Sequence, residues 1–218
     1  MVYTVSLSYE LELARRGGYY FIAGLDEAGR GAWAGPIVAG AVVLPLDRLD
    51  LMHALTGVKD SKLLSPYRRE KLLPVIELVA LSYGVGSATH TEIDSMGVVE
   101  ATRLAMGRAI EALDGQPDAL LTDALTLPDL ELPCTPLIKG DQKSLSIAAA
   151  SILAKVTRDR FMCKMDLLYP QYGFRAHKGY GTVRHHAALR EFGVTPIHRR
   201  SFEPVRMVYM SMPEGPWR

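Results

Sequence analysis

Apolar segments that are too short for most helices constrain the fold of this chain more than any other feature. They occupy residues 19–25, 36–44, 81–89, 119–122 and 136–138. Apolar runs of this length, bounded by Gly, Pro or charged residues, are typical of buried β-strands. The sequence therefore predicts a sheet of five strands, two of them early in the chain and joined by a short Gly-rich connection.

Segments with helical features separate and follow these strands. A helix is expected from Ser65-Pro66 to about Ala80, because Ser is a favoured N-cap and Pro is favoured at the first helical position. A long helix at 146–168 carries many small side chains, which would let it lie close against the sheet. With further helices at 91–113 and 182–192, the order predicts an α/β fold with a mixed sheet flanked by helices.

The length of 218 residues suits one large domain with small appendages. We expect an N-terminal segment at 1–18, a main domain at 19–168 and a C-terminal basic extension at 169–218 that packs on the same domain. There is no run of about 18 apolar residues that could cross a membrane. The start lacks the pattern of a signal peptide, so a cytoplasmic protein is expected, and a monomer is the default.

Charge is distributed unevenly along the chain. Residues 1–138 carry 11 Lys or Arg against 18 Asp or Glu, whereas residues 139–218 carry 14 against 6. This polarity is compatible with an acidic site that holds cations beside a basic surface that holds a polyanion. It is equally compatible with an accident of surface composition.

Acidic residues directly follow three of the predicted strands. Asp26 and Glu27 follow the first, Asp123 the fourth and Asp141 the fifth. The carboxyl ends of neighbouring parallel strands form the usual ligand crevice of an open sheet, so these carboxylates are expected to meet there. For a single Asp, a turn or a helix cap is the simpler explanation.

Carboxylates brought together in this way would repel each other unless cations neutralise them. Oxygen ligands without interleaved His or Cys favour Mg²⁺ or Mn²⁺ over zinc. Two such ions about 3.5–4 Å apart are the usual apparatus for displacement at phosphorus. The sequence therefore predicts a two-ion phosphodiester hydrolase.

The segment Gly29-Arg30-Gly31 comes next to the first acids. Its spacing to Gly35 is one residue too long for a dinucleotide fingerprint. Glycines allow a backbone to approach a ligand closely, and a backbone that close can contact a ribose 2′-hydroxyl. A tight turn between strands is a comparable explanation.

The basic tail contains Tyr180 between two glycines, which suits stacking on a sugar or base better than a place in a core. The neighbouring Lys, Arg and His, including His177, His185 and the run 198–200, are expected to neutralise phosphates. Lys62 is a further candidate for a phosphate contact. Each of these residues could also be an ordinary solvated side chain.

Taken together, these residues resemble the ribonuclease HII family. The resemblance is carried by motifs that keep their order over roughly residues 20–205. They are Asp26-Glu27-Ala28-Gly29-Arg30-Gly31, Ala34-Gly35-Pro36, Asp60-Ser61-Lys62, Lys139-Gly140-Asp141, Ala154-Lys155-Val156, Arg158-Asp159, Gly179-Tyr180-Gly181-Thr182 and His198-Arg199. One departure is Ala124 after Asp123, where bacterial members often have Gly.

The resemblance implies a ribonuclease H-like fold with a C-terminal helical extension. It implies cleavage of the RNA strand of RNA–DNA hybrids and of single ribonucleotides embedded in duplex DNA, a step in ribonucleotide excision, leaving 3′-hydroxyl and 5′-phosphate ends. Its implied metal-binding catalytic acids are Asp26, Glu27, Asp123 and Asp141, with Asp159 as an accessory acid near the second metal. Gly29, Arg30, Gly31 and Tyr180 would sense the 2′-hydroxyl, and Lys62 would lie near the scissile phosphate.

Two other functions remain open at this point. One is a nuclease or resolvase of the same fold that cuts DNA structures regardless of ribose. The other is a binding module in which the acids are structural and the basic tail holds hybrid. Cleavage of a ribonucleotide-containing duplex, compared with a four-way DNA junction and with chelator present, separates all three.

Overall fold

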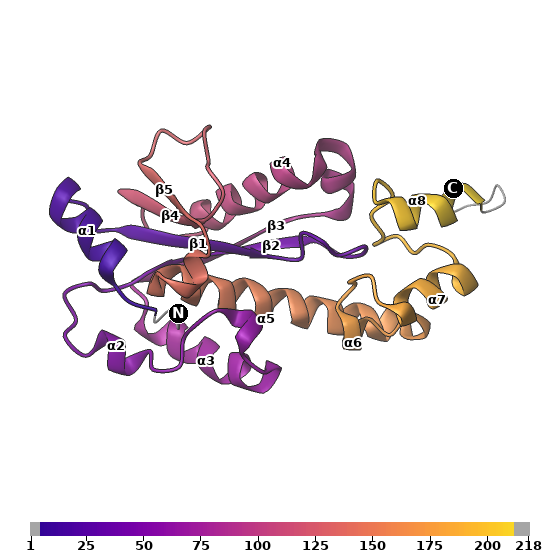
Figure 1. Cartoon of the computed structure of the whole chain (residues 1–218), viewed down its shortest axis with the longest axis horizontal. Helices are drawn as coiled ribbons and strands as arrows, with labels where there is room; N and C mark the ends of the chain where they lie inside the picture. Colours follow the sequence, from indigo (N-terminus) through magenta and orange to yellow (C-terminus); the bar gives the residue numbers. More distant parts are fainter. Residues whose placement is uncertain (1–4, 212–218) are drawn as a thin grey trace.

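The computed structural model describes residues 5–211 and contains a five-stranded mixed sheet (Figure 1). The strand order is β3-β2-β1-β4-β5. The strands are β1 (Ile22–Ala28), β2 (Ile37–Val43), β3 (Ser82–Ala88), β4 (Ala119–Asp123) and β5 (Cys134–Leu137). The predicted five-stranded α/β architecture is confirmed.

The central strand β1 pairs differently on its two sides. It is antiparallel to β2 as far as Ala28, but parallel to β4 only as far as Leu25. Asp26 and Glu27 therefore lie within β1, opposite residues of β2, and do not follow the strand as the sequence suggested. The apolar pattern stops at Leu25, where β4 pairing also stops, and it carries no sign of the longer pairing with β2.

Helices cover both faces of the sheet (Figure 1). On one face lie α5 (Leu145–Leu168) and, outside it, α3 (Pro66–Val79), while α4 (His90–Glu111) covers the other. As expected, Ser65 caps α3 by accepting from the Arg68 N–H at 3.3 Å, and the small residues of α5 are buried. Gly97 interrupts α4 with a non-helical conformation.

Glycines in the strands let these two helices approach the sheet closely. A Cβ on Gly24 would lie 2.3 Å from the Ser146 carbonyl carbon of α5. A Cβ on Gly86 would lie 2.1 Å from the Ala105 carbonyl oxygen of α4. The small side chains of α5 thus explain only part of the close packing, because the strands also carry glycine at the contact.

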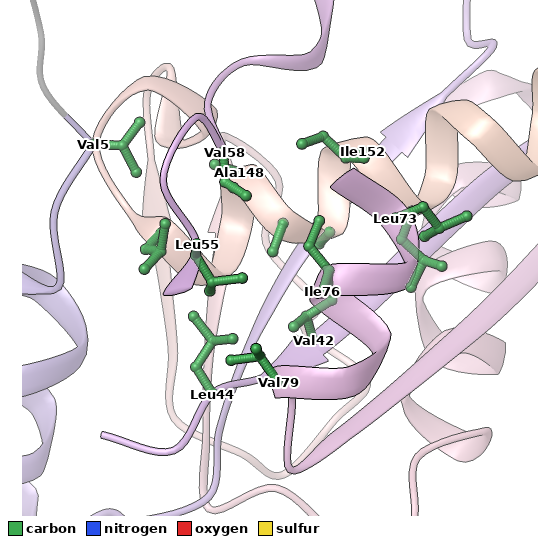
Figure 2. Packing of buried hydrophobic residues seen from close by; sticks show 14 of the residues in the cluster. Val5, Val42, Leu44, Leu55, Val58, Leu73, Ile76, Val79, Ala148 and Ile152 are labelled. Atoms are coloured by element: carbon green, nitrogen blue, oxygen red, sulfur yellow. The ribbon is translucent and has the colours of Figure 1, made fainter. Parts of the chain in front are cut away.

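A large apolar cluster between α5, α3 and β2 forms one layer of the core (Figure 2). Val42 of β2, Ile76 of α3 and Ile152 of α5 meet there, and each is almost fully buried. Burial of a side chain of this size contributes about 1.5–3 kcal/mol. This cluster makes α3, β2 and α5 a rigid support for the residues at their ends.

The remaining helices lie at the two ends of the molecule. They are α1 (Ser8–Gly17), α2 (Leu51–Ala54), α6 (Phe174–His177), α7 (Val183–Phe192) and α8 (Glu203–Ser211), with short 3₁₀ turns η1 (Ser61–Leu63), η2 (Gly140–Gln142) and η3 (Pro170–Tyr172). The helix expected at 182–192 is α7 with Thr182 as its N-cap, whereas α1 and α8 were not foreseen. The outermost parts of the predicted N- and C-terminal segments lie outside residues 5–211. No helix within these residues is both long and apolar enough to cross a membrane.

The C-terminal extension, from η3 through α8, packs against the connection between β1 and β2. An isolated bridge joins Ala32 to Tyr180, and a second joins Ala34 to His198. The connection at 29–36, which we call the 29–36 loop, is therefore held between two segments that follow it by more than a hundred residues. The Gly29-Arg30-Gly31 segment directly follows the acids of β1, and this contact joins the extension to the loop that contains it.

Candidate active site

Three of the predicted acids meet at one edge of the sheet. Asp26, Asp123 and Asp141 each offer an oxygen such that the three oxygens lie within 4.8 Å of one another. Asp26 and Asp141 are buried, and Asp123 is partly buried. The expectation that these carboxylates converge is thus met by the geometry, although they come from a strand interior, a strand end and a turn.

The alternation of side chains along a strand explains which acids meet. Asp26 lies two residues after Gly24, which faces α5, and Asp123 lies two residues after Leu121, which packs on Ile147 of α5. Both carboxylates therefore share the α5 face. Glu27 is not in the group of three, but it lines the same pocket as Asp26 and Asp123.

Asp141 reaches the group through the short turn η2. Its turn is held in place because the Gly140 N–H donates to Asp123 Oδ1 at 2.8 Å. Lys62 Nζ lies 3.6 Å from Asp141 Oδ2, on a side chain that is largely exposed. Asp60 orders the same region, since its side chain accepts from the Lys62 N–H at 2.9 Å and from Gln142 Nε2 at 3.1 Å.

The acids raise one another's pKa because they are buried together. Burial raises the pKa of Asp26 well above its usual range, and the charges of Glu27 and Asp123 raise it further. Burial, followed by the charges of Asp60 and Asp123, raises the pKa of Asp141 to about 6. Although burial alone lowers the pKa of Lys62, the charges of Asp26 and Asp141 outweigh it and raise the pKa. Full ionisation of these carboxylates would therefore require more positive charge than the cluster contains.

Glu27 is the fourth predicted acid, and it is only partly satisfied. Its Oε1 accepts from Arg30 at 3.3 Å, whereas its Oε2 is buried without a hydrogen-bond partner in the structure. Burial raises its pKa, and the charge of Arg30 opposes this. An unpartnered buried carboxylate oxygen beside three clustered carboxylates is what a hard cation with oxygen ligands would satisfy. The residues present therefore fit a divalent metal site.

The predicted substrate contacts gather beside these acids. A pocket of about 440 Å³ contains the predicted contacts Gly29, Arg30, Gly31, Lys62 and Tyr180 together with three of the four acids. Its lining is Asp26, Glu27, Asp123, Ala28, Gly29, Arg30, Gly31, Ser61, Lys62, Lys155 and Tyr180. The separate sequence motifs thus form one continuous surface.

Tyr180 lies at the rim of this pocket, half-exposed and flanked by two cations. Lys155 Nζ is 5.7 Å and Arg158 Cζ is 5.3 Å from the centroid of its ring.

Lys155 and Asp60 both fell inside motifs noted in the sequence, but the sequence alone suggested no role for either. Only their position beside the pocket and beside Asp141, respectively, marks them as part of the site.

Asp159 lies one helical turn beyond Lys155. Its carboxylate accepts from Lys155 Nζ at 2.7 Å and lies 3.4 Å from Arg69 Nη2. It is not among the three acids whose oxygens are grouped, so its role as an accessory acid stays a prediction.

The expectation for the tail histidines and for Arg199 is wrong. His177, His185, His198 and Arg199 are buried, and they do not form a phosphate-binding surface. His185 Nε2 lies 3.0 Å from His198 Nε2, and His185 Nδ1 bonds the Tyr180 carbonyl at 3.0 Å. Burial lowers the pKa of His185 to about 4 and of His198 to about 3, so both rings are neutral at pH 7. Residue type and sequence proximity to Tyr180 suggested contact with substrate, but packing against Tyr172 and Phe174 gives them a structural place.

Comparisons with known proteins agree with this geometry. A family model described as ribonuclease HII matches residues 23–205. A ribonuclease HII of Chloroflexus aurantiacus is 51% identical over 209 residues, which cover 96% of this chain and 98% of that protein. A ribonuclease HII of Geobacillus kaustophilus is 53% identical over 202 residues, covering 93% and 75%. The crystal structure of ribonuclease H2 from Pyrococcus horikoshii OT3 is similar with a TM-score of 0.71 and 32% identity, covering 87% of this chain and 97% of that one.

Proposed function

Because this chain belongs to the ribonuclease HII family, and is therefore a metal-dependent endonuclease that acts on RNA–DNA hybrids, we propose that the acids at the sheet edge are its catalytic carboxylates. They are Asp26, Glu27, Asp123 and Asp141. The observation that carries this assignment is the convergence of three carboxylate oxygens within 4.8 Å. Among the described residues, the ion pairs of the four acids are Lys62 with Asp141 and Arg30 with Glu27. Family membership does not favour the alternative of a DNA-structure nuclease, nor a mere binding module.

The four acids would hold two Mg²⁺ or Mn²⁺ ions. When bound, such ions neutralise the carboxylates and the phosphate and activate the attacking water. The residues of the chain supply the geometry: the Gly140 N–H fixes Asp123, and the Glu27 N–H fixes Asp26 through a 2.7 Å bond to Oδ1. Lys62, which faces Asp141, would contact the scissile phosphate. The proposed products are a 3′-hydroxyl and a 5′-phosphate.

Recognition of ribose would come from the opposite side of the pocket. There the main chain of Gly29, Arg30 and Gly31 lies beside the half-exposed ring of Tyr180. An exposed main-chain N–H can donate to a 2′-hydroxyl oxygen, and an aromatic ring can stack on the sugar or base next to it. These groups would direct cleavage to single ribonucleotides in duplex DNA as well as to longer hybrids.

Further assignments complete the proposal. Residues 169–218 are an extension of the catalytic domain at 19–168 that supports this recognition side, which the bridges from Tyr180 and His198 support. Asp159 acts as an accessory acid through Lys155 and Arg69, the two cations that it contacts. The protein acts as a monomer in the cytoplasm, which size-exclusion chromatography and localisation of a tagged chain would test.

One cleavage assay tests the central proposal. A duplex with a single ribonucleotide is compared with the all-DNA duplex and with a four-way DNA junction, with Mg²⁺, Mn²⁺ or chelator, and products are mapped to the nucleotide. We expect metal-dependent cleavage beside the ribonucleotide alone. Equal cutting of the all-DNA duplex would overturn the ribose assignment, and cleavage in chelator would overturn the metal assignment.

A further inference from the structure

The conformation of the 29–36 loop depends on a guanidinium group that belongs to the C-terminal extension. Arg199 is fully buried, and its main-chain N–H donates to the Trp33 carbonyl at 2.8 Å. Its side chain then turns back under the loop. Nε donates to the Gly35 carbonyl at 3.0 Å, Nη1 to the Arg30 carbonyl at 2.7 Å and Nη2 to the Gly29 carbonyl at 2.7 Å.

Within residues 5–211 Arg199 forms no ion pair with a carboxylate, and the charge of Asp94 is only a minor influence on its pKa. A buried charge normally requires an opposite charge, and here three main-chain carbonyls provide the compensation. Burial lowers the pKa of Arg199 only to about 9, so the guanidinium stays charged at pH 7. Its planar fork fixes the directions of the carbonyls it binds, which a flexible ammonium would not.

The direction of these carbonyls decides the direction of the neighbouring N–H groups. In a trans peptide the C=O and the following N–H point in opposite directions, and the described chain has no cis peptide. Since the Gly29 and Arg30 carbonyls point inward to Arg199, the N–H groups of Arg30 and Gly31 point outward. Neither N–H has a hydrogen-bond partner within residues 5–211, and both residues line the pocket.

We propose that Arg199 is a positioning residue for ribose recognition. It holds two consecutive peptide planes so that the N–H groups of Arg30 and Gly31 face the pocket, where they can donate to a 2′-hydroxyl oxygen. This inference rests on the proposed function of the Gly29-Arg30-Gly31 segment. Arg199 itself touches no substrate.

A second buried arginine shows how specific this contact is. Arg158 of α5 also binds main-chain carbonyls, namely those of Ala34, Pro36 and Lys178. These lie at the far end of the 29–36 loop and in the extension. Within the described residues, Arg199 is the side chain that binds the Gly29 and Arg30 carbonyls.

The test separates positioning from simple stability. Arg199→Lys keeps the positive charge and loses the fork. Leu189→Ala is the matched control, because Leu189 is fully buried in the same extension and belongs to the apolar cluster on which Trp33 of the loop packs, but its side chain has no hydrogen-bonding atom. Binding is measured for a duplex with one ribonucleotide and for the identical all-DNA duplex, with Ca²⁺ as the metal and after verifying that the duplex stays intact. Thermal unfolding is measured for every variant.

We expect the parent and Leu189→Ala to prefer the ribonucleotide duplex, and Arg199→Lys to lose about tenfold or more of that preference, as expected for two hydrogen bonds. Binding of all-DNA duplex should change little. In single-turnover cleavage, Arg199→Lys should lower the rate constant at saturating enzyme, whereas Leu189→Ala should not.

Three results would count against the inference, and they are distinguishable. Unchanged preference in a folded Arg199→Lys overturns the role of Arg199 and leaves the proposed function standing. No preference in the parent overturns the proposed ribose recognition itself. If Arg199→Lys does not fold, Arg199→Gln, which keeps a planar donor without a buried charge, carries the same measurement. Failure of both to fold makes Arg199 a structural residue only.

Discussion

Two clusters of buried like charge adjoin the 29–36 loop, the acids that precede it in β1 and the arginines that bind its carbonyls, and they are compensated in opposite ways. Within residues 5–211, the acids of β1, β4 and η2 have few donors and only Lys62 and Arg30 as counter-charges, and burial raises the pKa values of Asp26, Glu27 and Asp141. The arginines Arg158 and Arg199 are equally buried, but six main-chain carbonyl bonds satisfy them. Burial without full compensation leaves the acid cluster suited to bind cations, whereas main-chain carbonyls already satisfy the arginine pair.

The largest expected effect comes from removing charge from the acid cluster. Asp26→Asn should reduce cleavage of a single-ribonucleotide duplex by about a thousandfold or more, since several kcal/mol of metal-dependent stabilisation are lost. Metal-free stability should stay the same or rise, because Asn removes a carboxyl group whose ionisation is opposed by burial and by the charges of Glu27 and Asp123. Asp129→Asn, an exposed acid away from the site, serves as the control in the same assay. Parent-like cleavage by Asp26→Asn would remove this residue from the active site.

On the recognition side, the largest loss should follow truncation of Tyr180. Tyr180→Ala should slow cleavage at a single ribonucleotide by about tenfold to a hundredfold, the worth of one stacking contact. Tyr180→Phe keeps the ring and should stay within a few-fold of the parent. Rate constants on a single ribonucleotide and on a long hybrid check this, and an equal loss in both variants would point to the hydroxyl group instead of the ring.

Lys62 lines the pocket together with the acids and Tyr180, and its removal should have a smaller effect than truncation of Tyr180. Lys62→Ala should weaken binding about tenfold at most and should reduce the slope of log affinity against log salt by about 0.9, as expected for one phosphate contact. Affinities at several salt concentrations measure the slope. A full parental slope in Lys62→Ala would mean that the side chain only balances the charge of Asp141.

The smallest effects concern how the stability of the fold changes with pH. The slope should have opposite signs for the acid cluster and for the buried histidines. The pKa of Asp141 rises from 3.8 to about 6, so the folded metal-free protein binds more protons than the unfolded chain between these values and loses stability as pH rises through them. The pKa of His198 falls from 6.5 to about 3, so stability is instead lost as pH falls below 6.5. Urea unfolding in chelator across pH 4–8 should show that Asp141→Asn reduces the first slope and His198→Asn the second, while Asp26, Glu27 and His185 keep part of each. A slope that neither variant changes would assign it to other groups.

Much of the fold was predictable because local patterns carried it. Apolar runs and the Ser65 cap identified the strands and α3, and the small residues of α5 anticipated close packing against the sheet. The end of β1 was misplaced because pairing with β2 continues beyond the apolar run. Helix α1 was missed, and its one buried residue is a polar one: Glu10 accepts from the hydroxyls of Ser144 and Ser146 at the start of α5.

For the candidate site, too, some residues could be predicted from the local sequence and others could not. Acids near strand ends are recognisable because carboxylates in a buried setting are rare without a purpose. The tail residues were misread because His and Arg are usually exposed, and nothing local distinguishes a phosphate-binding arginine from one that binds carbonyls 164 to 170 residues away in the chain.

By itself, the sequence determined the identity of the strands, the acids at the sheet edge and the motifs shared with ribonuclease HII, because periodicity and residue type act over a few neighbouring positions. Only the tertiary structure decided which acids share a face, which cations are buried and which carbonyls they bind. The physical reason is that burial and hydrogen-bond partners depend on contacts between distant segments. Asp26 and Asp123 meet because two strands pair, and Arg199 reaches Gly29 because the extension folds back over the 29–36 loop.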